Sequence, residues 1–562
     1  MTQRKYDKTK ERIKNGRQSS GSCKRFQTSG IHQACEASQH HQVHQTRKTS
    51  RSPESQRAFR EERGGSGSPT MAKSAAAGDR DSRSMEIFSA DTVIVGAGAS
   101  GLAAAVAASR QGSRVIVAEG NENPGKKLYA TGNGRCNFSN LRCSSQCFNR
   151  PEDLFVESVF RRFGVEETLG FFQSEGMMVR LEDGGRYYPY SGQASAVVNT
   201  LRRAAENAGC RFLFSDRAEE ISFCGASPDA VRMSAEDSAA GVAEDDADAA
   251  AAAGSVSQSG SEAGRFCVRL QSGKTLYGKN LIIACGGRAG LKTGSTGDGY
   301  GFARVFGHTL TPPRPALTAA ESGAAFLAGL KGVRARGRVQ LWERSAGKIA
   351  EERGEIQFTG TGISGICVFD LTRFMDELLP PAKKRKRRES GSSAEEPAKI
   401  RKEYTIVCDF VPEKDEEELY RILSKQMRTA GTKSSEENSR NLFRWRPRSL
   451  SDALAGIVNE RLAAVIAGRA HEDLRRAVKM LKNFDVPVSH TRGWEEAQVT
   501  CGGVRREELE PATLQSRLRP GLYFCGEVID VDGRCGGFNL QWAWSSGAAA
   551  GSAAAKKGRE RC

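Results

Sequence analysis

The hydrophobic residues between positions 92 and 119 follow the pattern of a β-α-β unit. A short apolar run, residues 92–95, is followed at once by a glycine-rich turn and then by an alanine-rich segment, residues 102–108. A second apolar run, residues 114–118, ends directly before Glu119. Short apolar runs beside glycines are typical of buried strands, and the alanine-rich segment is typical of a helix. The pattern predicts strand, tight turn, helix and strand.

The turn has the G-x-G-x-x-G spacing of a dinucleotide-binding site. The first glycine allows the chain to reverse, the second allows the backbone to approach a pyrophosphate, and the third allows close packing of helix and strand. The helix N-terminus then directs free N–H groups at the phosphates. The acid lies 18 residues after the last glycine, where a carboxylate can accept hydrogen bonds from ribose hydroxyls. The predicted contacts are Gly96, Gly98, Ala99, Ser100, Gly101 and Glu119.

A second glycine-rich loop, residues 125–137, follows this unit. It carries cations and amides, and it suits a segment that covers the phosphates and reaches a ring system. Arg135 is the best charge partner for a pyrophosphate in this loop. The residues expected to contact the ligand are Lys127, Gly134, Arg135, Cys136 and Asn137.

Two later strands also end in glycines. Residues 281–285 form an apolar run that ends at Gly286, and residues 521–525 form another that ends at Gly526 and a carboxylate, Glu527. A glycine loop at 533–537 then leads into a helix that begins near Phe538. Strand ends of this kind meet at the ligand-binding edge of an α/β sheet.

The character of the chain changes between residues 317 and 491. Alternating strands come first and helices follow, which predicts a separate inserted domain. Residues 360–365 repeat the G-x-G-x-x-G spacing after a strand. We expect no nicotinamide site there, because no second strand ends in an acid about 20 residues further on.

Charge and composition single out three polar segments. Residues 1–84 carry a net charge of +10 and the run 383–388 adds +6, while the whole chain has +17. The tail at 1–87 and the insertion at 225–264 have few large apolar side chains, so both are predicted to be disordered. The basic run falls in a predicted surface loop, 379–403. The rest of the chain is nearly neutral, and on this ground we expect no nucleic-acid partner.

The compartment is predicted to be the cytoplasm. The 15 cysteines are scattered without a C-x-x-C pair, as expected of reduced thiols, and no apolar run is long enough to span a membrane. No secretory signal is recognisable. The basic, serine-rich start of the tail leaves organelle targeting open.

Four blocks, residues 96–101, 125–137, 294–300 and 521–547, resemble the YhiN-like (HI0933-like) family of NAD(P)/FAD-dependent oxidoreductases. Weaker likeness at 185–189, 354–365 and 497–504 extends the resemblance over most of residues 88–555. It implies an α/β fold, in which a Rossmann-like FAD-binding domain of glutathione-reductase type carries an inserted mixed β/α domain. The FAD-binding domain is expected to be built from two segments, residues 88–316 and 492–562, with the insert at 317–491 between them.

The resemblance also assigns roles within an FAD site. Glu119 would hold the adenosine ribose and Glu527 the ribityl hydroxyls. The loop at 536–541 would present N–H groups and a helix dipole to the flavin pyrimidine edge, where reduced flavin is negative. The C-terminal contacts on this reading are Gly526, Glu527, Gly536, Gly537, Phe538 and Asn539.

The catalytic residues are less clear from the sequence. Cys136, Cys143 and Cys147 lack the five-residue step of a redox-active disulfide, so Cys136 is expected to pack near the flavin. His490 and Tyr188 are the candidate acid or base groups, with packing the ordinary alternative for a tyrosine. His308 is expected to be a surface or cap residue. No metal-ligand set is recognisable.

We therefore expect an FAD-dependent oxidoreductase that moves a hydride through flavin N5 and acts on a small molecule. NAD(P)H-linked reduction of a C=C bond is the leading reaction. An amine-type oxidase that uses oxygen and an RNA-associated, tRNA-modifying flavoprotein are the alternatives. The oligomeric state is not predicted.

Overall fold

The computed structural model describes residues 86–224, 264–376, 402–431 and 447–559. The predictions for the tail, for most of the 225–264 insertion and for the basic run therefore concern residues outside the described part of the chain. Within that part no helix is long and apolar enough to cross a membrane.

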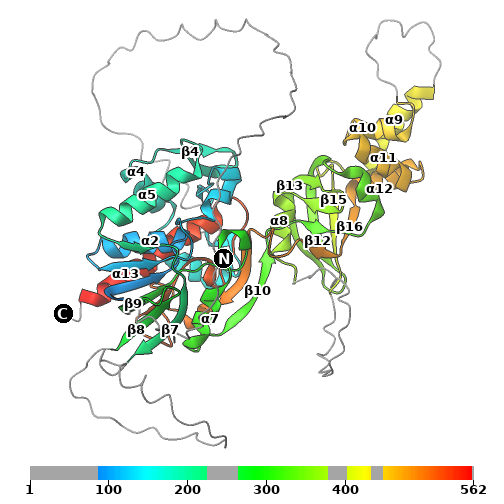
Figure 1. The fold of residues 1–562 in the computed structure, drawn as a ribbon. Coiled ribbons are helices and arrows are strands. Elements are labelled where there is room, and N and C mark those ends of the chain that lie inside the picture. The colour runs from blue at the N-terminus through cyan, green and yellow to red at the C-terminus, as the bar shows by residue number, and fades with distance from the viewer. Residues whose placement is uncertain (1–85, 225–263, 377–401, 432–446, 560–562) are drawn as a thin grey trace, which may run out of the picture. The chain divides into compact units, whose positions relative to one another are not determined.

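The first sheet has seven strands in the order β6-β2-β1-β9-β8-β7, with β19 paired to β9 (Figure 1). The strands β6, β2, β1, β9 and β19 run parallel, and β7, β8 and β9 form an antiparallel meander. Its strands are β1 (Ile87–Val95), β2 (Val115–Ala118), β6 (Arg211–Leu213), β7 (Ala218–Cys224), β8 (Arg265–Leu270), β9 (Thr275–Ile283) and β19 (Leu522–Phe524).

The central strand β1 explains where ligands can bind. Its last residue, Val95, is paired with Ala118 on one side and with Ile283 on the other, and Ile283 is paired with Phe524. Strands from distant parts of the sequence therefore end at the same edge. Since each is followed by a turn, the glycine turn, Glu119 and Glu527 come to one edge of the sheet.

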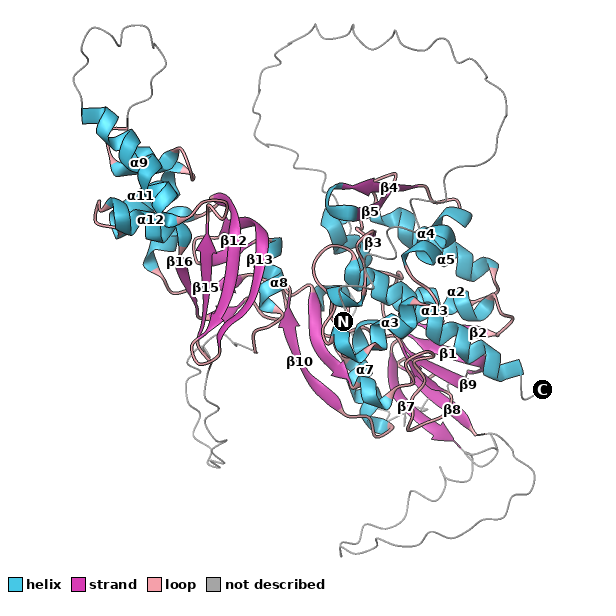
Figure 2. Ribbon diagram, turned by 180° about the vertical axis from the view of Figure 1, so that it is seen from behind, coloured by secondary structure: helices cyan, strands magenta, loops and turns pink. Residues whose placement is uncertain are grey.

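Helix α2 (Ala99–Ser109) packs against α13 (Phe538–Arg559), as Figure 2 shows. Glycines allow this close approach. A Cβ at Gly547 would lie 2.3 Å from the backbone oxygen of Ser100, and one at Gly551 would lie 2.3 Å from that of Ala104. The C-terminal helix is thereby held against the helix that follows the fingerprint.

The second sheet is built entirely from residues 320–491, in the order β16-β15-β12-β13-β14-β11-β17, and neighbouring strands in it are antiparallel. A separate hydrophobic core lies beside it. The strands are β11 (Ala320–Glu321), β12 (Arg334–Glu343), β13 (Gly347–Phe358), β14 (Gly362–Ser364), β15 (Tyr404–Asp409), β16 (Phe484–Val488) and β17 (His490–Thr491). The helices of this region are α8 (Ile366–Thr372), α9 (Glu416–Gly431), α10 (Leu450–Ala455), α11 (Glu460–Arg469) and α12 (Leu474–Lys482).

Two strands lead into and out of this second region. They are β10 (Leu310–Ala316) and β18 (Val499–Val504), which pair antiparallel, so the chain leaves the first sheet and returns beside its own point of departure. A small third sheet, β3-β5-β4, consists of Ser139–Asn140, Arg186–Pro189 and Val179–Glu182. The remaining α-helices are α3 (Phe155–Phe160), α4 (Val165–Ser174), α5 (Ala194–Asn207) and α7 (Asp298–Val305).

Two amphipathic stretches that are each typical of a single helix are divided between two helices in the structure. The stretch at 154–172 spans α3 and α4, and Gly164 begins α4 by donating its N–H to Glu167 Oε2 at 2.8 Å. The pattern at 451–465 likewise spans α10 and α11, because Asn459 caps α11 by accepting from Arg461 N at 3.0 Å. Local capping interrupts a continuous hydrophobic stripe in both places.

The second G-x-G-x-x-G stretch lies between strands of the wrong direction for a dinucleotide site. β13 and β14 are antiparallel, with Phe358 paired to Ile363. A β-α-β unit needs parallel strands, whereas residues 360 and 361 lie in the turn between β13 and β14 and residues 362–364 form β14 itself. This agrees with the expectation that they bind no nicotinamide.

Candidate cofactor site

The glycine turn is hydrogen-bonded to the side chain of Glu119. Its carboxylate accepts from the N–H of Ala97 at 2.7 Å, and from the N–H and side-chain amide of Asn121 at 2.8 and 2.7 Å. Glu119 is only 8% exposed. The acid that was predicted for the ribose thus also fixes the turn that approaches the pyrophosphate.

The three fingerprint glycines have different surroundings. A Cβ at Gly96 would lie 2.6 Å from the oxygen of Ala284, and one at Gly101 would lie 1.9 Å from the oxygen of Gly96. A Cβ at Gly98 would meet nothing within 4 Å. Gly98 is the N-cap of α2, where backbone N–H groups lack partners within the helix, so the open space lies where an anion is favoured.

Glu527 lies in a polar cluster at the same sheet edge. Its Oε1 accepts from the N–H of Thr500 at 2.8 Å, and its Oε2 lies 2.8 Å from Nζ of Lys127. A Cβ at Gly287 would meet Oε1 of Glu527 at 2.6 Å, whereas one at Gly286 would meet nothing within 4 Å. The ion pair therefore joins the glycine-rich loop to the strand end 400 residues further on.

Gly526 connects this edge to both helices. Its N–H donates to Ser546 Oγ of α13 at 2.9 Å. A Cβ at Gly526 would lie 2.3 Å from Ser100 Oγ in the first turn of α2. Only a glycine leaves room for the helix N-terminus here.

Arg135 is held by protein partners in the structure. Its guanidinium forms an ion pair with Glu182, and it lies over the ring of Tyr188, 4.2 Å from the centroid. The side chain is 38% exposed. Its predicted contact with the pyrophosphate stays a prediction, and these two contacts would have to yield for it to form.

Cys136 is fully buried, and burial raises its thiol pKa to about 12. The thiol is therefore protonated near neutral pH and is a poor nucleophile. Cys143 and Cys147 are also free thiols. This environment agrees with Cys136 as a packing residue.

The segment after Cys136 packs against the start of α13. Ser139 Oγ donates to Gln541 Oε1 at 2.6 Å, Asn140 Nδ2 donates to the oxygen of Gly536 at 2.8 Å, and Trp544 Nε1 donates to the oxygen of Phe138 at 2.8 Å. The structure thus brings the 125–137 loop region and the 536–541 loop together.

The turn before α13 requires glycines. Gly536 and Gly537 have φ of +131° and +94°, and a Cβ at Gly537 would lie 2.5 Å from the oxygen of Ser139. Asn539 holds the turn by accepting from Gly533 N at 2.7 Å and donating to Gly533 O at 2.9 Å. Phe538 is buried. The first N–H groups of a 22-residue helix lie beside this turn.

One buried polar atom in this region lacks a protein partner. Asn137 Oδ1 is buried without a hydrogen bond, and a Cβ at Gly537 would lie 2.8 Å from it. Buried acceptors are ordinarily satisfied, so this oxygen calls for a donor outside the chain. The open space at Gly98, the glycine turn held by Glu119 and this acceptor fit FAD, which carries a pyrophosphate near its middle and, at one end, a flavin ring with an N–H.

The candidate catalytic residues lie on different sheets. Tyr188 is on β5, buried beneath the Arg135 guanidinium. His490 is on β17, paired in register with Glu321, and its Nδ1 lies 3.0 Å from Ser489 Oγ. Their catalytic roles stay predictions.

His308 is not a surface residue. Its ring is buried, with Nδ1 2.8 Å from Glu508 Oε2 and Nε2 2.7 Å from Ser516 Oγ. The surface alternative was wrong, because the partners of its ring are 200 and 208 residues away in sequence. The cap alternative is confirmed, since the N–H of His308 donates to the oxygen of Ala303 at 3.1 Å at the end of α7. This histidine holds the 508–516 segment.

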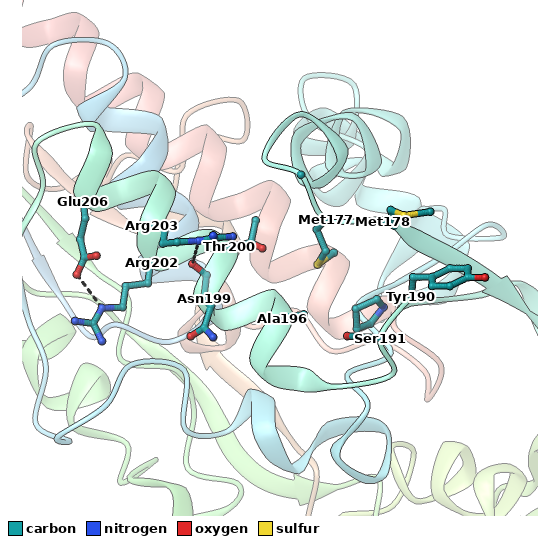
Figure 3. A pocket seen from close by; sticks show the side chains of 12 residues that line it. Met177, Met178, Tyr190, Ser191, Ala196, Asn199, Thr200, Arg202, Arg203 and Glu206 are labelled. Atoms are coloured by element: carbon teal, nitrogen blue, oxygen red, sulfur yellow. Dashed lines mark hydrogen bonds and ion pairs between the residues drawn. The ribbon is translucent and has the colours of Figure 1, made fainter.

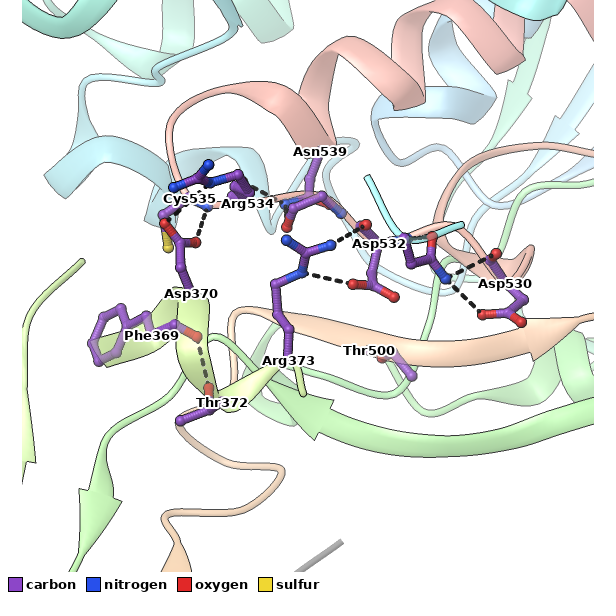
Figure 4. A network of polar contacts seen from close by, with 12 residues as sticks. Phe369, Asp370, Thr372, Arg373, Thr500, Asp530, Asp532, Arg534, Cys535 and Asn539 are labelled. Atoms are coloured by element: carbon purple, nitrogen blue, oxygen red, sulfur yellow. Dashed lines mark hydrogen bonds and ion pairs between the residues drawn. The ribbon is translucent and has the colours of Figure 1, made fainter. Parts of the chain in front are cut away.

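Sequence reasoning missed a charged network between α8 and the loop before α13 (Figure 4). Arg373 Nε donates to Asp532 Oδ2 at 2.7 Å, and the Cys535 N–H donates to Asp370 Oδ1 at 2.7 Å. Burial raises the pKa of Asp370, and it also raises that of Glu352, which pairs with Arg534. Acids perturbed in this way gather at functional sites. No local motif marks these residues.

A surface groove of about 730 Å³ lies beside the small sheet, between residues 176–178, the end of β5 and α5 (Figure 3). Met178, Tyr190 and Arg203 line it, and Arg202 in its wall donates to Glu206 at 2.8 Å. None of the predicted cofactor residues lines this groove. It is separate from the edge of the first sheet.

Fold and site together define a Rossmann-type FAD flavoprotein, an FAD-dependent oxidoreductase of mixed α/β class. The model of the HI0933-like protein Rossmann domain matches residues 90–264 and 244–553, and the chain belongs to this family. The resemblance and the fold class inferred from the sequence are confirmed.

The chain is also similar to proteins with named activities. A 3-dehydro-bile acid delta(4,6)-reductase of Clostridium scindens is 33% identical over 470 residues, which cover 83% of this chain and 98% of that protein. A ribosomal RNA dihydrouridine synthase of Haemophilus influenzae is 25% identical over 462 residues, 81% of this chain and 96% of that protein. Among solved structures, a 3-ketosteroid-delta4-(5alpha)-dehydrogenase from Rhodococcus jostii RHA1 matches with TM-score 0.40 and 14% identity, covering 84% of this chain and 98% of that one.

Proposed function

We propose that this protein uses FAD to reduce a carbon–carbon double bond that is conjugated to a carbonyl group. The observation that supports it most is that α13 links the two parts of the site: its Gly547 packs against Ser100, directly after the glycine turn, and the turn before it, at Gly537, lies beside Asn137. The names of two relatives suggest which reaction the flavin carries out. A delta(4,6)-reductase and a dihydrouridine synthase both add two hydrogens to a double bond next to a carbonyl.

FAD supplies hydride transfer through its N5 when it is bound. The chain supplies binding and orientation: Glu119 for the ribose hydroxyls, α2 for the phosphates, and Glu527 for the ribityl chain. The N–H groups and positive dipole end of α13 favour the negative charge of the reduced ring. A proton must also reach the carbon next to the carbonyl, and Tyr188 and His490 are the proposed donors.

We also propose NAD(P)H as the electron source and a small organic molecule as the substrate. The bile-acid relative supports the small-molecule substrate, because it has the higher identity of the two named proteins. Residues 317–491 would form the domain that selects the substrate, with residues 88–316 and 492–562 holding FAD. The strand pair β10 and β18, which leads into and out of the second sheet, supports this division.

A second candidate is reduction of uridine in RNA. Relatives from Haemophilus influenzae and Escherichia coli are named ribosomal RNA dihydrouridine synthases, at 25% and 26% identity. The ring double bond of uracil is conjugated to a carbonyl, so the same flavin chemistry serves both substrates.

The test begins with the visible spectrum of the purified full-length protein, followed by anaerobic titration with NADPH and NADH. Reduced protein is then mixed with a 4-en-3-one steroid, a uridine-containing RNA oligonucleotide or oxygen. We expect a bound flavin that NAD(P)H bleaches and an unsaturated ketone reoxidises quickly. Fast reoxidation by the RNA alone would favour the second candidate. A colourless protein that takes up no added FAD would contradict the proposal.

A further inference from the structure

Helix α8 holds both ends of the segment 532–535. In its second turn, Asp370 accepts the N–H of Cys535 at 2.7 Å. At its C-cap, Arg373 donates to the carboxylate of Asp532 at 2.7 Å and to its backbone oxygen at 2.8 Å. Asp370, Arg373 and Asp532 are all buried, and Figure 4 shows their contacts. Helix α8, which belongs to the region of the second sheet, therefore holds the loop before α13 by hydrogen bonds at both ends.

The segment 532–535 leads directly into the glycine turn of the candidate cofactor site. Cys535 is followed by Gly536 and Gly537, which adopt positive φ angles because glycine has no Cβ and its backbone is unusually free. On one side, Asn140 holds this turn through the oxygen of Gly536. On the other side the Cys535 N–H is held by Asp370. Two glycines without side chains depend on such flanking contacts for a single conformation.

An aliphatic side chain would fill the position of Asp370 without the cost of burying a charge. Burial raises its pKa, and its compensating contacts are the Cys535 N–H and Arg534, whose Nε lies 3.8 Å away. Buried acids of this kind are weak contributors to stability. The contacts of Asp370 with the Cys535 N–H and with Arg534 instead fix the geometry of the loop before α13.

We propose that Asp370 is a positioning residue for the cofactor: its carboxylate fixes the Cys535 N–H, and with it the turn that presents the start of α13 to the flavin pyrimidine edge. This inference rests on the proposed placement of FAD. It does not depend on which substrate is reduced.

The test measures FAD binding to the full-length apoprotein by titration, together with the visible circular dichroism of the bound flavin. Asp370→Ala removes the acceptor, and Asp370→Asn keeps an oxygen at the same place. Asp376→Ala is the matched control, because Asp376 is exposed and pairs with Lys402 at the surface. The thermal midpoint of each apoprotein is measured alongside.

We expect Asp370→Ala to bind FAD about tenfold to a hundredfold more weakly, as for the loss of one hydrogen bond to a charged group. Asp370→Asn and Asp376→Ala should stay within about threefold of the native protein, by the same reasoning. The flavin dichroism should change in Asp370→Ala alone. The loss of FAD affinity should not follow from a loss of stability, so the thermal midpoints of the apoproteins should not fall in proportion to the affinities.

Equal FAD affinity and dichroism in the native protein and Asp370→Ala would overturn the inference and leave the proposed function standing. So would a loss of affinity in Asp370→Asn as large as that in Asp370→Ala. If Asp370→Ala does not fold, Asp370→Asn decides, and altered dichroism of its bound flavin would count against the inference. A native protein that binds no FAD would overturn the proposed function as well.

Discussion

The ammonium group of Lys127 lies 2.8 Å from Oε2 of Glu527, which joins a glycine-rich loop near the start of the fold to a strand end 400 residues later. Both side chains are partly exposed, so the pair adds little to stability. Its importance lies in placing a cation and a carboxylate together at the edge where the dinucleotide is expected.

Glu119→Gln should lower the free energy of unfolding of the apoprotein by about 1–3 kcal/mol. The two carboxylate oxygens accept from separate donors, Ala97 and Asn121, and an amide group would turn an N–H toward one of them. Urea unfolding of the apoprotein measures this change, with the exposed Glu122→Gln as the control. Equal midpoints for the two variants would contradict the role of Glu119 in holding the turn.

Gly537→Ala should weaken both stability and FAD binding. The new methyl group would lie 2.5 Å from the oxygen of Ser139, in a backbone conformation at φ +94° that alanine disfavours. The control is Gly301→Ala in α7, where a Cβ meets nothing and a helix former replaces glycine. Thermal unfolding with and without FAD measures the difference. We expect a lower midpoint only for Gly537→Ala, and a smaller stabilisation by FAD.

Arg373→Ala should lower the free energy of unfolding by about 3–5 kcal/mol, because it leaves the buried Asp532 carboxylate unpaired. Both side chains are buried, at 6% and 4% exposure. Arg344→Ala is the control, since Arg344 and Glu403 form an exposed pair that should contribute about 1 kcal/mol at most. Denaturant unfolding of the two variants decides. A similarly small loss of unfolding free energy in both variants would show that the Arg373–Asp532 pair does not hold the loop before α13 in place.

His308 should make stability depend on pH. Burial lowers the pKa of His308 in the folded protein, while a histidine in the unfolded chain has a pKa of about 6.5. As pH falls below that value, the unfolded chain takes up a proton first, so its stabilising contribution is complete above a pH of about 6.5 and declines below it. His308→Gln keeps polar atoms toward Glu508 and Ser516 but does not titrate.

The urea midpoint of native protein and His308→Gln, measured about one pH unit above and one below the unfolded-state pKa, checks this. The native protein should lose more stability between the two values than the variant does. An equal loss in both would assign the pH dependence to other groups.

Loss of the proton donor should slow the reaction of the reduced flavin with substrate without slowing the reduction of the flavin by NAD(P)H. Tyr188→Phe and His490→Gln each remove one candidate, and the true donor should slow reoxidation of the reduced flavin by substrate about 10²- to 10⁴-fold. Reduction by NAD(P)H should be unchanged. Stopped-flow absorbance measures both half-reactions, with Tyr190→Phe as the exposed control. Native rates in both variants would remove both residues from the mechanism.

Local features predicted much of the first sheet. The alternation of apolar runs, glycines and a terminal acid over residues 92–119 determines the β-α-β unit, because turn geometry and strand burial act over a few neighbouring residues. The same reasoning discounted the second glycine stretch. It failed at Gly164, Asn459 and His308, where a cap or a partner distant in sequence decides the outcome.

The sequence by itself determined that this protein has a Rossmann-type dinucleotide fold, since the spacing of glycines, helix and acid is a property of consecutive residues. Only the tertiary structure decided which groups surround the loop before α13. Asp370 and Cys535 are 165 positions apart, and Arg373 and Asp532 are 159 apart. No periodicity or short motif links such residues, because their contact arises from the packing of one element against another.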